Sequence, residues 1–149
     1  MDKMTRGLVA GAAGTTALNV VTYLDMAVRG RPASSTPEQS VEKMADVAGA
    51  DLGEEEKAEN RKAGLGPMLG LGTGLGAGAA YGLLAGRRSV PKPVATAALT
   101  VLAMLGSSAP MTALGLTDPR QWSVSDWVMD AVPHLAYGVV AAGVYDALR

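Results

Sequence analysis

Two long stretches without a charged residue most constrain how this chain can fold. One extends from Ala63 to Gly86 and the other from Pro93 to Thr117. Each exceeds the roughly 20 residues that an α-helix needs to cross the hydrocarbon core of a bilayer. Because lipid offers the backbone no hydrogen-bond partners, a lone crossing segment of this kind forms a helix. We therefore predict membrane-spanning helices over about 64–86 and 93–116.

Two further stretches complete a bundle of the same kind. The stretch 7–28 is interrupted only by Asp25, close to its end. The stretch 125–148 is predicted to be a fourth span because it is long enough to cross a bilayer and can pack with the other three. It carries Asp126, Asp130, His134 and Asp146. The predicted fold class is all-α, a single membrane domain over 1–149 with four transmembrane helices and a helical extramembrane loop at 30–63.

Composition agrees with helices that pack closely in lipid and excludes several chemistries. The chain has 19 Gly, two Trp and no Phe in 149 residues, which suits helices whose backbones approach one another in a membrane. It has no Cys, so disulfides and thiolate catalysis are excluded, and one His is too few for most metal sites. A net charge of −1 predicts no nucleic-acid partner. We expect no metal and no cofactor.

Two other interpretations of these stretches are weaker. The Gly-rich stretch 64–86 resembles a flexible linker, but it carries Leu, Met, Ala and Tyr where linkers carry Ser and charges. Lys3 and Arg6 precede an apolar stretch as in a secretory signal. Polar residues follow that stretch, however, and no A-x-A cleavage site stands at the right place. We expect an uncleaved first helix.

The loop at 30–63 has the signals of two short helices. We predict a first helix capped by Thr36, with Pro37 at its first position and Gln39 closing a capping box. Its apolar residues recur on one face, as in an amphipathic helix: Val41, Met44, Ala45 and Ala48. A second helix is predicted from Glu54 through Arg61. Such a hairpin either rests on the lipid interface or presents a surface to a partner.

Glycines recur at every fourth residue through the second predicted span. They are Gly66, Gly70, Gly74, Gly78, Gly82 and Gly86. The first span has a matching pattern in two pairs, Gly7 with Gly11 and Ala10 with Gly14. Repeated GxxxG lets another helix approach closely and gain dispersion and Cα–H···O contacts. The pattern leaves open whether that neighbour belongs to this chain, to a second copy or to another protein. In the third span, Pro110 crowds the carbonyl of Gly106, so a kink or hinge is expected there.

The last predicted helix has a polar face. Asp126, Asp130, His134 and Tyr137 follow one another at intervals of four, four and three residues. His134 lies roughly 14 Å into the helix, near mid-bilayer, where an ionisable residue costs about 2.5 kcal/mol or more unless it is paired. His134 is expected to bond to Asp130 or to Asn19 of the first helix.

Three roles for this polar group remain open. It can be a structural pair, a proton-sensing or proton-relay pair, since His titrates near neutral pH, or, least favoured, a metal ligand pair. We predict no enzymatic activity, because neither a nucleophile nor a binding loop accompanies the acid and base. No catalytic residue is therefore assigned.

The C-terminal part of the chain resembles a known family. The stretch Gly115-Leu116-Thr117-Asp118-Pro119, followed by the two acidic residues and His134-Leu135, is similar to the end of YagU-type bacterial inner-membrane proteins. The similarity covers about 115–149, and elsewhere it rests on helix layout. The resemblance implies a location in the bacterial inner membrane and a contribution to acid tolerance.

Together these features predict a non-enzymatic accessory or scaffolding subunit of a larger inner-membrane complex, such as a lipid or solute transport complex. The alternative is a self-assembling, proton-linked or acid-stress protein that uses Asp130 and His134. The expected partners are membrane lipids and either other membrane subunits or further copies of the chain. The basic cluster from Arg87 to Lys92 in a short loop favours cytoplasmic termini.

Overall fold

The chain is a bundle of long helices in a computed structural model that describes residues 1–86 and 88–149. Within these residues, four helices are long and apolar enough to cross a membrane. They are α1 (Lys3–Arg29), α3 (Glu55–Ala85), α4 (Lys92–Ala113) and α5 (Val124–Ala147). A shorter helix, α2 (Thr36–Ala48), and a 3₁₀ turn, η1 (Pro119–Gln121), lie between them. The all-α prediction with four spans is confirmed.

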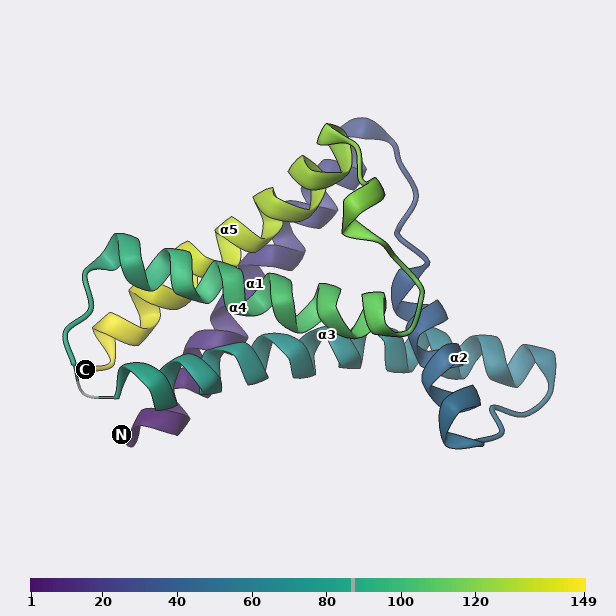
Figure 1. The fold of residues 1–149 in the computed structure, drawn as a ribbon, viewed down its shortest axis with the longest axis horizontal. Helices are drawn as coiled ribbons and strands as arrows, with labels where there is room; N and C mark the ends of the chain where they lie inside the picture. Colours follow the sequence, from purple (N-terminus) through teal and green to yellow (C-terminus); the bar gives the residue numbers. More distant parts are fainter. Residues whose placement is uncertain (87) are drawn as a thin grey trace.

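The long helices alternate in direction, so both termini lie at the same end of the bundle. Gly7 of α1 lies against Gly78 of α3, and Gly11 lies one turn further along, against Gly74. This descending order makes α1 and α3 antiparallel. The same argument makes α4 antiparallel to α5. Figure 1 shows both termini beside the connection from α3 to α4, as an even number of crossings requires.

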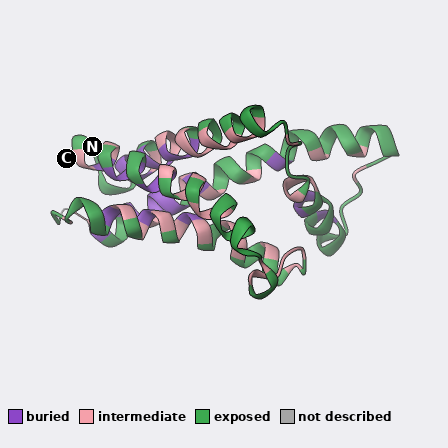
Figure 2. Cartoon of the chain, turned by 90° about the horizontal axis from the view of Figure 1, so that it is seen from above, coloured by how far each residue is buried: buried purple, intermediate pink, exposed green. Residues whose placement is uncertain are grey.

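The core of the bundle is small and made mainly of alanine. Leu99 and Tyr137 are the largest fully buried side chains, and most other core residues are Ala or Tyr. Figure 2 shows most buried residues gathered where the four long helices meet, and a smaller group on α2. Large apolar side chains instead face outward, including Val20, Leu84, Val101, Val132 and Val139. An apolar outer surface around a core of small residues suits a bundle solvated by lipid.

The loop after α1 forms one helix where two were predicted. Glu54 precedes α3, which continues without a break from Glu55 to Ala85. The prediction of a separate helix ending at Arg61 is therefore wrong. The end of the extramembrane segment and the second span form one continuous helix. No left-handed glycine stops the helix, because Gly64 and Gly66 do not have positive φ, and a helix continues where no stop signal intervenes.

Helix α2 begins one residue earlier than predicted. Ser35 is its N-cap and makes no capping bond with its side chain, and Thr36 is the first helical residue. The predicted capping box on Thr36 is wrong, because Gln39 bonds instead to the Ser35 hydroxyl, at 3.1 Å. Val41 and Ala45 are buried as expected. The other apolar residues of the predicted face, Met44 and Ala48, are exposed.

Candidate functional site

His134 occupies a polar cluster between α4 and α5. Its Nδ1 lies 2.7 Å from the backbone oxygen of Asp130 and 3.5 Å from a carboxylate oxygen of the same residue. Its Nε2 lies 3.4 Å from the hydroxyl of Ser107 on α4. The pairing with Asp130 arises because residues four apart share a helix face. The partner on α4 comes from 27 residues away in the sequence.

Hydrogen-bond roles follow from what each partner can do. A backbone carbonyl only accepts, so Nδ1 of His134 carries a proton and donates to Asp130. Ser107 donates its own hydrogen to the Met104 carbonyl, at 3.0 Å. The Ser107 oxygen can then only accept a hydrogen bond from Nε2 of His134. That bond requires a proton on Nε2 as well as on Nδ1. If Ser107 rotates, the same oxygen donates to a neutral ring. The cluster can therefore hold either protonation state of His134.

Asp130 brings an unsatisfied carboxylate oxygen into this cluster. Its side chain is 21% exposed, and Oδ2 has no hydrogen-bond partner among the residues that the structure describes. Buried polar atoms are nearly always hydrogen-bonded, and exceptions mark sites where something else is bound or where a proton is held. Within a membrane the energetic penalty is larger still, so such groups are functional candidates.

Two of the other predicted site residues have partners elsewhere. Asp126 closes a capping box with Ser123 at the start of α5, so its carboxylate faces the helix end and not His134. Tyr137 is fully buried and donates to the Gly74 carbonyl of α3, at 2.6 Å. Both residues share the sequence period of the polar face, but the side chains point to different neighbours.

Asn19 is also separate from the His134 cluster. It is exposed on α1 and lines an open groove of about 290 Å³ between α1 and α3, together with Thr15, Thr16, Pro67, Met68 and Leu71. His134, in contrast, bonds to α4 and α5 residues.

The glycines of α1 and α3 lie against each other within this chain. A Cβ atom on Gly78 would overlap the Gly7 carbonyl, and one on Gly7 would overlap the Gly78 carbonyl. Gly11, Gly74 and Gly82 are equally crowded, and Gly14 is covered by the Tyr137 ring. Gly66 faces Pro37 of α2, whereas Gly70 and Gly86 have open space. The neighbour of the central glycines is therefore α1.

In α4, Pro110 lies inside the helix, and it has no N–H to donate to the Gly106 carbonyl. Ser107 donates to the Met104 carbonyl, one turn before itself. Gly106, the other residue of the predicted kink, faces the methyl group of Thr73 on α3.

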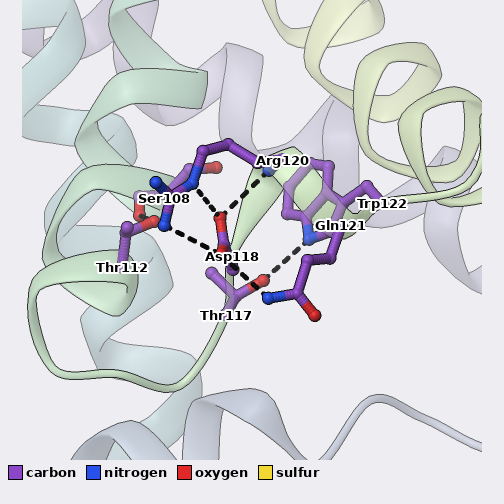
Figure 3. A network of polar contacts seen from close by, with 7 residues as sticks. All are labelled: Ser108, Thr112, Thr117, Asp118, Arg120, Gln121 and Trp122. Carbon is purple, nitrogen blue, oxygen red and sulfur yellow. Dashed lines mark hydrogen bonds and ion pairs between the residues drawn. The ribbon is translucent and has the colours of Figure 1, made fainter.

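The residues that carry the family resemblance form the turn that leads into α5. Figure 3 shows Asp118 at the centre of this turn, with Arg120 and Gln121 donating to its carboxylate. Three hydrogen bonds hold the pKa of Asp118 below its usual range. The bond from the Arg120 side chain has the largest effect, followed by those from the Arg120 backbone N–H and from Gln121. Trp122 donates to the Thr117 hydroxyl, at 2.8 Å. The motif thus builds a compact connection outside the four spans.

The fold defines the chain as a multi-pass membrane protein. Comparisons with protein families, with curated proteins and with solved structures found no match.

Proposed function

We propose that this protein is a non-enzymatic accessory or scaffolding subunit of a larger complex in the bacterial inner membrane, such as a lipid or solute transport complex. The observation that supports this role is the hairpin of α2 and the first turns of α3. Figure 1 shows it extending away from the point where the four long helices meet. A structured element of this kind outside the bundle offers a surface to another protein.

The hairpin is held as one unit by packing and charge. Val41 and Ala45 of α2 are buried, and Pro37 touches the backbone at Gly66 of α3. Lys62 of α3 pairs with Glu59 at 2.7 Å and reaches Glu42 of α2 at 3.6 Å. The Lys62 side chain is only 12% exposed. This packing fixes α2 on α3 and leaves its opposite face free.

The exposed surface of α2 combines apolar and charged side chains. Val47 is 73% exposed and Met44 is 47% exposed, and the exposed Lys43 and Asp46 are their neighbours in the sequence. Exposed apolar side chains rimmed by charge are typical of interaction surfaces. The crowded glycines of α1 and α3, by contrast, are already occupied within the chain, so α2 is the better candidate for partner docking.

The test is purification of the tagged protein from its own host in a mild detergent, followed by mass spectrometry of what co-purifies. The wild type should bring down envelope or transport proteins in stoichiometric amounts. Met44→Ser with Val47→Ser should lose them, while the control Val28→Ser, at a more exposed site on α1, should retain them. A wild-type protein that purifies as a monomer or a homo-oligomer alone would refute the proposal.

A second candidate function rests on the unsatisfied carboxylate of Asp130 beside His134. We propose a proton-linked role for this pair, in line with the acid tolerance that the YagU-type resemblance implies. His134→Gln should abolish a pH-dependent phenotype in cells and leave the amount of assembled protein unchanged. Asp126→Asn is the matched control, because Asp126 lies on the same helix but caps its start. Equal acid survival of His134→Gln and wild type would exclude the role.

We further propose that both termini are cytoplasmic. Arg88 and Lys92 lie at the end of the bundle that holds the termini, and basic residues in short loops favour the cytoplasmic side. The chain has no Cys, so single cysteines report topology directly. In intact cells, an impermeant maleimide should label Ser34→Cys and spare Ser89→Cys. The reverse labelling would invert the orientation.

A further inference from the structure

The end of the bundle that holds the termini has a recess lined by basic and aromatic side chains. Arg88 follows α3, Lys92 begins α4, and Arg149 follows α5. With Tyr81, Tyr145 and Asp146 they line one recess. Two segments far apart in the sequence, 88–92 and the end of α5, thus bring three cationic groups together.

The positive charge of this recess is only partly neutralised. Asp146 pairs with Arg149 and lies 4.0 Å from Lys92, so one carboxylate serves two cations. Among the described residues, no carboxylate pairs with Arg88. The recess therefore presents excess positive charge, which attracts an anion.

Arg6 adds a buried cation behind the recess. It is only 7% exposed, and its guanidinium lies 5.3 Å from the ring centroid of Tyr145. Its Nε has no hydrogen-bond partner among the residues described. The Tyr145 hydroxyl is already engaged, because it donates to the Gly86 carbonyl at 2.9 Å. The ring gives Arg6 a cation–π contact but no neutralising charge.

The outer surfaces of α3 and α4, the helices that flank the recess, are apolar. Leu83 and Leu84 of α3 and Val94 of α4 are all at least half exposed, and they lie within a few residues of Arg88 and Lys92. A ligand that matches both features has an anionic head and long apolar chains.

We propose that an anionic phospholipid binds at the surface over this recess, whose interior of about 10 Å³ is too small for a phosphate. The headgroup phosphate lies between Arg88, Lys92 and Arg149, and the acyl chains follow the outer surface of α3 and α4 past Leu84 and Val94. A free phosphate would use only the charged half of this arrangement. The proposal is independent of the accessory role, since it concerns the opposite end of the bundle from α2.

The test is native mass spectrometry of the purified full-length protein titrated with phosphatidylglycerol or phosphatidylcholine. Phosphatidylglycerol should be retained more strongly. Each basic residue near an anionic lipid contributes about fivefold in affinity, so Arg88→Gln with Lys92→Gln should weaken phosphatidylglycerol binding by roughly 25-fold. The control variant, Arg29→Gln with Arg120→Gln, removes the same amount of charge at the other end of the bundle. It should leave phosphatidylglycerol binding unchanged.

The variant Asp146→Asn shows whether a loss of binding in the double variant comes from a lost lipid site or from misfolding. Removing the competing carboxylate should strengthen phosphatidylglycerol binding, which a poorly folded variant cannot do. Equal retention of the two lipids, an equal loss in both double variants, or weaker binding by Asp146→Asn would each overturn the proposal. Inorganic phosphate that competes fully with the lipid would identify a simple anion site and also overturn it.

Discussion

The substitution Gly78→Ala tests the closest contact in the bundle. Gly78 of α3 faces the backbone of α1, and a Cβ atom there would lie 2.7 Å from the Gly11 Cα and 2.8 Å from its nitrogen, besides overlapping the Gly7 carbonyl. These are backbone atoms, so no side chain can turn away to make room. Since carbon atoms pack best at about 3.5–4.0 Å, α1 and α3 must separate by roughly 1 Å.

The free-energy change follows from that separation. A gap of about 0.5–1 Å removes roughly a quarter to a half of each dispersion contact along the interface, and overpacking of this kind typically costs about 1–3 kcal/mol. Alanine regains up to about 1 kcal/mol through its higher helix propensity. We therefore expect Gly78→Ala to lower the free energy of unfolding by about 1 kcal/mol.

The matched control is Gly76→Ala, two residues away on the same helix. Gly76 has nothing within 4 Å of its would-be Cβ, so the substitution should leave stability unchanged or raise it by up to about 1 kcal/mol. Both variants are measured by circular dichroism during denaturation of the detergent-solubilised protein with SDS. If Gly78→Ala is as stable as Gly76→Ala, α1 does not pack on this face of α3.

Three further predictions concern single contacts. Tyr137→Phe removes the donor to the Gly74 carbonyl and should lower the free energy of unfolding by about 1–2 kcal/mol in the same denaturation assay; an unchanged value would show that the bond is not formed. Ser123→Ala removes the N-cap of α5 and should cost about 1 kcal/mol, and a larger loss would indicate a role beyond capping. The lowered pKa of Asp118 means that its bonds to Arg120 stabilise the turn above the usual Asp pKa and are lost as the pH falls through the lower, folded value. Tryptophan fluorescence should follow that loss, and Asp118→Asn should abolish the pH dependence.

The spans were predictable from the sequence because the signal for each is local. Uncharged stretches of sufficient length predict a helix wherever they occur, and the structure places α3 and α4 over both of them. The bond between Asp130 and His134 is local as well, since it joins residues one turn apart. The separate helix ending at Arg61 was wrong because helix ends depend on stop signals, and none is present there.

The partners across helices could not be predicted, because they depend on how the helices rotate against each other. Gly70 and Gly74 are equivalent members of the every-fourth-residue series, yet only Gly74 meets α1. Ser107 lies 27 residues from His134 in the sequence, and nothing local connects the two. Its one sequence signal is its polarity within an apolar span, which requires some partner.

The unbroken length of α3 has a mechanical consequence. Its 31 residues extend about 46 Å at 1.5 Å per residue, well beyond the roughly 30 Å of a hydrocarbon core. One continuous helix thus joins α2, outside the bundle, to the glycine contact with α1. Pro67 lies inside this helix between its outer end and that contact, and because proline has no N–H to donate, α3 can bend there without disturbing the glycine contact.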